Sequence, residues 1–226
     1  MPRTARAAVG GIVYHVLNRG NGRMGVFRKP GDYRAFLQLL LDGKERAKIE
    51  LFGFCLMPNH WHLVLRPKED HDLAGYLSWV TNTHVKRYRA HYRSTSGHLY
   101  QGRYKSFPVE DDVYFRTLLR HVESNPLKAK LVERAQDWQW SSLGGDTSLL
   151  TKMLDPWPVE RPRDWTALVN RPMKEADTKQ ICECLKRDRP LGSESWTRQI
   201  SERLGLMYTL NPRGRPRRAK GKDEAK

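Results

Sequence analysis

A β-hairpin is predicted for residues 51–66, which read Leu-Phe-Gly-Phe-Cys-Leu-Met-Pro-Asn-His-Trp-His-Leu-Val-Leu-Arg. The first half is an apolar run without a break, and Pro58-Asn59 is a typical turn pair. The second half alternates, so that His60 and His62 share one face of the strand and Trp61 lies on the other. A hairpin of this kind needs further strands and a covering layer to be stable.

The flanking sequence supplies both. Residues 12–19 and the segment 100–109 are rich in β-branched and aromatic residues, as strands are. Apolar residues recur at helical spacing in three further segments, at about 32–48, 72–92 and 112–124. This order predicts an α+β fold, a ferredoxin-like antiparallel sheet with helices on one face.

The C-terminal third differs in composition. A Pro-rich stretch at residues 155–162 marks a boundary, and Trp196, Ile200 and Leu204 follow the spacing of an amphipathic helix. The chain then ends in a basic segment broken by Pro and Gly, which is typical of disorder. We therefore expect a main domain at 1–150, a linker or helical extension at 151–188, and a helix with a basic tail at 189–226.

The charge balance indicates a polyanionic partner. The 226 residues carry 41 Lys and Arg against 25 Asp and Glu, a net charge of +16, which favours nucleic acid. Three cysteines, an odd number, do not suggest a disulfide framework and fit a reducing compartment. No apolar run is long enough for a membrane span and no signal peptide is evident, so a cytoplasmic location without a membrane partner is expected.

The histidine pair of the hairpin is the sharpest candidate for chemistry. Two imidazoles on one face of a strand can ligate one divalent ion, although an isolated His-x-His is more often structural. The third predicted helix offers polar residues on one face, because Tyr114, Leu118, His121 and Asn125 are spaced by whole turns. That pattern fits either a site or a capped surface helix.

Five blocks of sequence, in this order, resemble the REP-associated tyrosine transposases of the HUH single-tyrosine superfamily. The resemblance covers about residues 8–145, and the tail at 189–217 is similar to that of some longer members. The blocks are Tyr14-His-Val-Leu-Asn-Arg-Gly-Asn21, Met57-Pro-Asn-His-Trp-His-Leu-Val-Leu65, Gly97-His-Leu-Tyr-Gln-Gly-Arg-Tyr-Lys105, Leu118-Leu-Arg-His-Val-Glu-Ser-Asn-Pro-Leu-Lys-Ala129 and Asp137-Trp-Gln-Trp-Ser-Ser142.

The resemblance implies an HUH transposase fold that binds single-stranded DNA hairpins and a divalent metal, Mg²⁺ or Mn²⁺. It further implies cleavage and rejoining of DNA by transesterification, through a covalent link between a tyrosine and the 5′-phosphate. By position, His60, His62 and Asn125 match the metal ligands of the family. The position of the nucleophilic tyrosine is occupied by His121.

That departure leaves three interpretations open. His121 could attack the phosphate itself, because histidine can form a covalent phosphoryl intermediate. Tyr114 could replace the missing tyrosine, although it lies about 10 Å away along the helix at a rise of about 1.5 Å per residue. Alternatively, cleavage is lost and the protein is a catalytically silent binder of DNA hairpins.

Several further residues are candidate DNA contacts. Cationic side chains neutralise phosphates and aromatic rings stack on unpaired bases, which is expected of Asn18, Arg19, Arg103, Tyr104 and Lys105. The tail segment containing Arg213 and Arg215 resembles an AT-hook for the minor groove, or is a generic basic arm. An RNA-binding module is a rival interpretation of the sheet, but the aromatic signature of that module is not evident. The sequence leaves open whether the chain is a monomer or a dimer.

Overall fold

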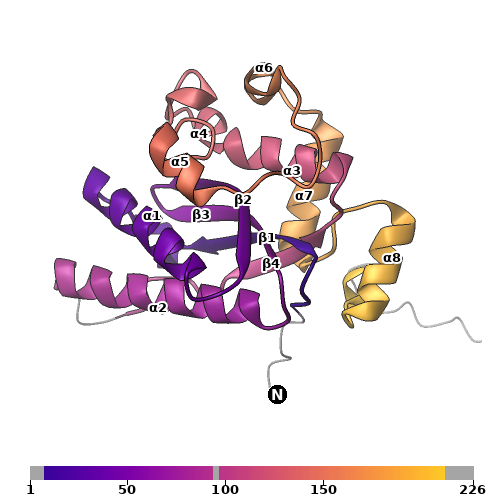
Figure 1. Cartoon of the computed structure of the whole chain (residues 1–226), viewed down its shortest axis with the longest axis horizontal. Coiled ribbons are helices and arrows are strands. Elements are labelled where there is room, and N and C mark those ends of the chain that lie inside the picture. Colours follow the sequence, from indigo (N-terminus) through magenta and orange to yellow (C-terminus); the bar gives the residue numbers. More distant parts are fainter. Residues whose placement is uncertain (1–7, 94–96, 212–226) are drawn as a thin grey trace, which may run out of the picture.

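The centre of the protein is a four-stranded sheet, seen in a computed structural model that describes residues 8–93 and 97–211. The strand order is β2-β3-β1-β4, and all neighbouring strands are antiparallel. The strands are β1 (Val13–Arg19), β2 (Ile49–Met57), β3 (His60–Pro67) and β4 (Lys105–Val109). The predicted α+β class with an antiparallel sheet is therefore confirmed (Figure 1).

The hairpin of β2 and β3 forms as the sequence predicts. Met57 pairs with His60 and Cys55 with His62 across the turn. Trp61 is fully buried on the opposite face of the sheet, where it belongs to the same apolar cluster as Leu63 and Leu65. The alternation of β3 thus directs the two histidines to one side and the tryptophan to the other.

The sheet is covered on both faces. Helices α1 (Pro30–Lys44) and α2 (Asp72–Tyr92) pack on the side of Trp61, and α3 (Val113–Glu123) packs on the side of the histidines (Figure 1). The expectation of helices on one face alone was wrong. Its physical reason is that β2 is apolar on both sides, since Phe52 and Cys55 are as deeply buried on the α3 side as Leu51 and Phe54 are on the other.

Helix α3 is held against the sheet by an apolar stripe and fixed at its start by a cap. Phe115, Leu118, Leu119 and Val122 are all fully buried. The Asp112 carboxylate accepts a hydrogen bond of 2.7 Å from the backbone N–H of Tyr114, as an N-cap residue does. The short helix α4 (Asn125–Lys128) follows directly, with Pro126 in its first turn.

The rest of the chain wraps around this core in short helices. They are η1 (Asn21–Arg23), η2 (Ala135–Asp137), α5 (Thr147–Met153), α6 (Trp165–Asn170), α7 (Glu175–Arg187), α8 (Glu194–Arg203) and η3 (Met207–Thr209). The amphipathic helix predicted around Trp196 is α8. No helix within the described ranges has the length and apolar content needed to cross a bilayer.

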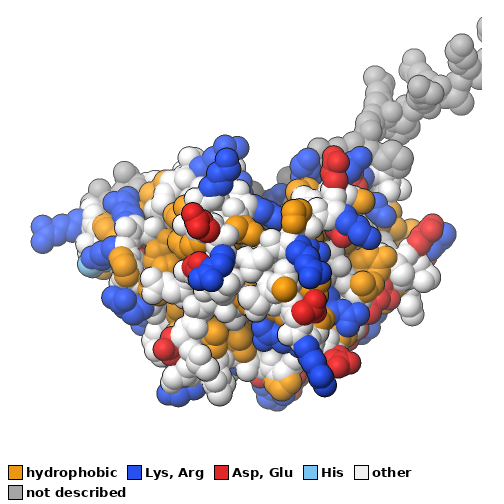
Figure 2. Space-filling view, turned by 90° about the horizontal axis from the view of Figure 1, so that it is seen from above, with side chains coloured by type: hydrophobic (Ala, Val, Ile, Leu, Met, Phe, Trp, Pro, Cys, Tyr) orange, Lys and Arg blue, Asp and Glu red, His pale blue; other side chains and the backbone are white. Residues whose placement is uncertain are grey.

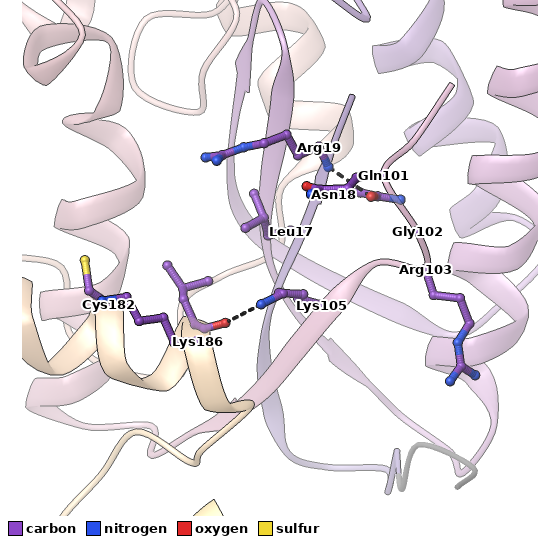
Figure 3. Close-up of a pocket in the computed structure, with 10 residues that line it drawn as sticks. Leu17, Asn18, Arg19, Gln101, Gly102, Arg103, Lys105, Cys182 and Lys186 are labelled. Carbon is purple, nitrogen blue, oxygen red and sulfur yellow. Dashed lines mark hydrogen bonds between the residues drawn. The ribbon is translucent and has the colours of Figure 1, made fainter. Parts of the chain in front are cut away.

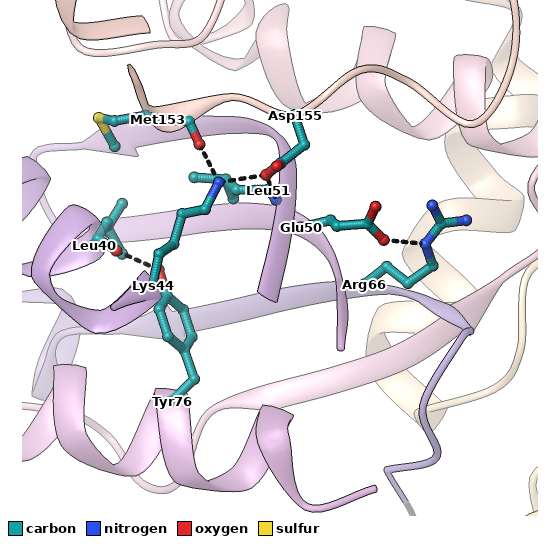
Figure 4. Close-up of polar contacts among 8 residues, drawn as sticks. All are labelled: Leu40, Lys44, Glu50, Leu51, Arg66, Tyr76, Met153 and Asp155. Carbon is teal, nitrogen blue, oxygen red and sulfur yellow. Dashed lines mark hydrogen bonds and ion pairs between the residues drawn. The ribbon is translucent and has the colours of Figure 1, made fainter. Parts of the chain in front are cut away.

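Residues after 150 are tied to the edge strand β2. The Asp155 carboxylate accepts a 2.7 Å hydrogen bond from the Leu51 backbone N–H and pairs with the Lys44 ammonium (Figure 4). Lys44 Nζ also donates to the Met153 carbonyl at 2.8 Å. Glu50 of β2 and its cross-strand partner Arg66 of β3 form an ion pair of 2.6 Å. The division of the chain at residue 150 stays a prediction.

Candidate nucleic-acid and metal site

Four histidines lie close together between the sheet and α3, and we call them the histidine cluster: His15, His60, His62 and His121. The rings of His60 and His62 have centroids 5.0 Å apart, and the His121 ring of α3 is 6.4 Å from that of His62. His15 of β1 joins them through a 2.9 Å hydrogen bond between its Nε2 and the Nδ1 of His62. The structure therefore brings His60, His62 and His121 together.

Burial keeps the rings of the cluster uncharged at neutral pH. It lowers the pKa of His15 and of His121 to about 3 each. For His60, burial and then the nearby Arg19 charge lower the pKa to about 4. Burial likewise holds the pKa of His62 well below its ordinary range, with smaller contributions from the neighbouring rings and Arg19. A neutral imidazole has a free lone pair, so the rings can act as ligands or bases.

The hydrogen bonds of the histidine pair leave nitrogen atoms available. His60 Nδ1 lies 2.6 Å from the Asn59 Oδ1. Since an amide oxygen only accepts, His60 carries its proton on Nδ1 and has a lone pair on Nε2. His62 Nε2 is buried and has no hydrogen-bond partner within the described part of the chain. Buried polar atoms are rarely left unsatisfied, so this nitrogen fits the part of a metal ligand.

Asn125 begins α4 at the end of α3, one turn after His121. Its Nδ2 donates to the carbonyls of His121 at 2.9 Å and of Val122 at 3.2 Å. The amide nitrogen is thus occupied by the helix end. An amide oxygen is a suitable ligand for Mg²⁺ or Mn²⁺.

The donor set fits a divalent ion that draws further ligands from elsewhere. In residues 8–93 and 97–211, no three His, Cys, Asp or Glu side chains form a complete metal-binding group. Two imidazoles and one amide oxygen are an open set, which leaves positions for water or phosphate oxygens. The unpartnered Nε2 of His62 agrees with that requirement.

The surroundings of His121 suit a hydrogen-bonding group better than an exposed nucleophile. It is 7% exposed, and Lys128 Nζ lies 3.3 Å from its Nδ1. Burial lowers the pKa of Lys128 to about 8, so the amine is still largely protonated at neutral pH and donates to Nδ1. That contact places the ring proton of His121 on Nε2.

Tyr114 is not part of the histidine cluster. It lies near the other end of α3, where it packs against the apolar cluster beneath the helix. Seven residues separate it from His121, about 10 Å at the helical rise. The structure keeps this helix regular over the interval, so the shift needed to bring Tyr114 to the site is absent from it.

A basic groove lies beside the cluster, with a volume of about 520 Å³. It brings together four of the residues predicted to bind DNA, Asn18, Arg19, Arg103 and Lys105 (Figure 3). Arg19 pairs with His60 across β1 and β3, and its buried Nε has no hydrogen-bond partner within the described residues. An adjoining groove of about 690 Å³ shares Asn18 and Arg103 and adds Tyr104. Arg213 and Arg215 lie outside the described residues.

Helix α7 forms the far wall of the basic groove, which the sequence did not predict. Cys182, Leu185 and Lys186 line it, and Lys105 Nζ donates to the Leu185 carbonyl at 3.0 Å (Figure 3). The amphipathic pattern of this helix was the available signal, but the pattern does not say where the helix docks. Figure 2 shows Lys and Arg interspersed with fewer Asp and Glu on the face that it presents.

His15 is the other residue that the sequence analysis missed. It stands in the first of the five blocks, and the alternation of β1 places it on the histidine side of the sheet. Only the strand order, with β1 beside β3, brings it to His62. That order cannot be read from the spacing of residues along the chain.

Comparison with known proteins identifies the family. The family model described as "Transposase IS200 like" matches residues 8–125, which contain β1 to β4, α3 and Asn125. This chain belongs to the IS200-like transposases. The matched range thus includes the whole histidine cluster and ends at Asn125, whereas the wall formed by α7 lies outside it.

Two individual proteins are similar to this IS200-like transposase. A putative REP-associated tyrosine transposase of Haemophilus influenzae is 25% identical over 113 residues, 45% of this chain. The chain spans 63% of the length of that relative. A solved structure of a REP-associated tyrosine transposase bound to a REP hairpin has a TM-score of 0.54 at 17% identity. The match covers 72% of this chain and 93% of that one, and it shows that the two share a fold.

Proposed function

We propose that this protein binds hairpin-forming single-stranded DNA and cleaves and rejoins it by metal-assisted transesterification. The observation that carries the proposal is the pair His60 and His62, neutral and with free ring nitrogens, beside a groove lined by cations. Family membership supports the reaction class. The similar structure bound to a REP hairpin supports hairpin DNA as the partner.

In this proposal, the side chains at the end of β3 and of α3 hold the metal and orient the DNA. His60 Nε2, His62 Nε2 and Asn125 Oδ1 would be the ligands from the protein. A divalent ion bound there would polarise the scissile phosphate. Arg19, whose buried Nε has no partner within the described residues, would donate to a phosphate oxygen next to His60.

The basic groove would lead the strand to this point. Arg103, Lys105 and Lys186 line it and would neutralise successive phosphates, which is how single strands are held without regard to sequence. Tyr104 in the adjoining groove would offer a ring for stacking on an unpaired base. The C-terminal extension would thus be a part of the DNA-binding surface and not a separate module.

The group that attacks the phosphate is His121 in the first version of the proposal. A ring nitrogen would bond to phosphorus, the bond from phosphorus to the 3′ oxygen would break, and that oxygen would take a proton from water and leave as the 3′ hydroxyl. Lys128 would first have to release Nδ1, whose lone pair would then attack, because the ring carries its N–H on Nε2.

The second candidate function is a catalytically silent binder of DNA hairpins. The contact between Lys128 and His121 favours it, because it occupies one ring nitrogen and protonates the other. In this version His121 donates a hydrogen bond from Nε2 to a phosphate of bound DNA. Tyr114 takes part in neither version, since it lies about two helical turns from the cluster.

One experiment separates the two functions. The protein is incubated with a hairpin oligonucleotide that has a single-stranded flank, with and without Mn²⁺, and then resolved under denaturing conditions. A covalent protein–DNA adduct that needs Mn²⁺ and is lost in His121→Phe supports cleavage by His121. Intact binding without any adduct or cut strand leaves only the silent binder, and absence of binding refutes both.

A further inference from the structure

His15 occupies an unusual position for a buried histidine. It is fully buried in β1, and Phe107 of β4 packs on its ring at 5.0 Å between centroids. Among the described residues, its one side-chain hydrogen bond is with His62, and the two ring centroids lie 5.1 Å apart with an angle of 23° between the ring planes. The contact is diagonal across the two strands, since His15 pairs with Val64 and His62 pairs with Leu17.

The hydrogen bond between the two rings holds a single proton. The bond joins His15 Nε2 and His62 Nδ1 at 2.9 Å, and a neutral imidazole has one N–H and one lone pair. If His15 donated, His62 would carry its only N–H on Nε2, where it has no acceptor among the described residues and leaves no lone pair for a metal ion. If His62 donates from Nδ1, its Nε2 has a lone pair that faces the site.

We propose that His15 is a positioning residue that accepts the Nδ1 proton of His62 and so makes His62 Nε2 the metal-binding nitrogen. The inference rests on the proposed function, because it explains the tautomer of His62 by the role of that residue as a metal ligand. Histidine ligands commonly donate their other N–H to a neighbouring acceptor, which fixes the ring and raises its basicity. Here the acceptor is a second imidazole and not a carboxylate or a carbonyl.

The rings of the two ligand histidines are then oriented by two different hydrogen-bond acceptors. His60 donates its Nδ1 proton to the Asn59 side chain at the turn, and His62 donates its own to His15 inside the sheet. Both present Nε2 on the α3 side of β3. In this arrangement the N–H of His15 is on Nδ1, which has no acceptor among the described residues. One N–H is therefore unpaired whichever ring donates, and only donation by His62 leaves a lone pair on His62 Nε2 for a metal ion.

The test begins with the metal-free wild-type protein and does not depend on activity. Long-range proton–nitrogen NMR of the ring nitrogens at neutral pH reports which nitrogen of His62 carries the proton. We expect the proton on Nδ1. A proton on Nε2 would overturn the inference even if the protein binds metal and DNA as proposed.

Variants then measure the consequence for metal affinity. His15→Phe keeps the ring and removes the acceptor, and we expect Mn²⁺ affinity, measured by electron paramagnetic resonance, to fall about 10- to 100-fold. His15→Gln retains an acceptor of similar reach and should restore most of that loss. Phe107→Leu is the matched control, because it loosens the packing around His15 and leaves the hydrogen bond in place.

The outcomes distinguish this inference from the proposed function. Equal Mn²⁺ affinity in wild type and His15→Phe, or equal losses in His15→Phe and Phe107→Leu, would refute the positioning role alone. Failure of the wild type to bind Mn²⁺ would refute the proposed metal site, while the NMR result would still decide the tautomer. Unfolding of His15→Phe would leave the decision to His15→Gln and to that wild-type spectrum.

Discussion

The basic groove makes a quantitative prediction about salt. Four cations line it, Arg19, Arg103, Lys105 and Lys186. Each phosphate contact with a single strand contributes about −0.7 to the slope of log affinity against log salt concentration. Replacing Arg103 and Lys186 together by Gln should therefore make the slope shallower by about 1.4. Both side chains are exposed, so the fold should tolerate the change.

The size of the effect follows directly from that slope. When salt is raised from about 50 to about 200 mM, affinity falls in both proteins, and the factor by which it falls should be about seven times larger for the wild type than for the double variant. The assay is fluorescence anisotropy of a labelled hairpin oligonucleotide with a single-stranded flank, titrated at several salt concentrations. Lys152→Gln with Arg163→Gln is the matched control, because these exposed cations line neither of the two grooves.

Two results would refute this reasoning. The slope of the groove variant could equal that of the wild type, which would mean that DNA does not pass along α7. The control could also change the slope as much as the groove variant does. That result would mean that the net charge of +16 attracts DNA to the whole surface and not to one groove. Only a selective effect of Arg103 and Lys186 agrees with the groove.

Three further predictions concern the helix, pH and a buried carboxylate. Restoring the family residue by His121→Tyr should increase the amount of Mn²⁺-dependent covalent adduct on denaturing gels, whereas Tyr114→Phe should leave it unchanged; loss of the adduct in the latter would contradict the assigned site. Burial lowers the pKa of His84 to about 4, so the unfolded chain binds a proton there between about pH 6.5 and 4 while the folded chain does not. The free energy of unfolding, from urea titrations, should therefore decrease as the pH is lowered through this window, and it should decrease less in His84→Gln. Parallel curves for the two proteins would contradict this role of His84. Glu123 accepts 2.6 Å hydrogen bonds from Ser142 Oγ and Trp165 Nε1, so Glu123→Leu should destabilise the fold by about 1–3 kcal/mol by leaving a buried N–H unpaired. Trp165→Phe should then cost less in that variant than in the wild type, and additive costs would show that the two side chains are not coupled.

Local features of the fold could be predicted from the sequence because short-range patterns determine them. The turn at Pro58-Asn59 and the alternation around Trp61 predicted the hairpin and the face of each histidine, and the structure has both. The helix predicted at 72–92 has those bounds in the structure. Such features depend on neighbours along the chain, which is why they are visible without a structure.

Features that depend on strand order and docking could not be predicted. The sequence did not place α3 on the opposite face of the sheet from α1 and α2, because an amphipathic helix does not specify which surface it covers. For the same reason His15 and Lys186 were missed, since β1 lies beside β3 and α7 lies across the groove only in three dimensions. His60, His62 and His121 were therefore visible as motifs, whereas the places of His15 and Lys186 depend on tertiary contacts.

The position of the metal is the most direct test of the central claim that His60, His62 and Asn125 form one divalent-ion site. A crystal of the protein with Mn²⁺ and a hairpin oligonucleotide would show the ion by its anomalous scattering. We predict one strong peak within bonding distance of both Nε2 atoms and of Asn125 Oδ1, with a DNA phosphate beside it. A peak elsewhere, or ordered DNA in the groove with no peak at the two histidines, would contradict the account.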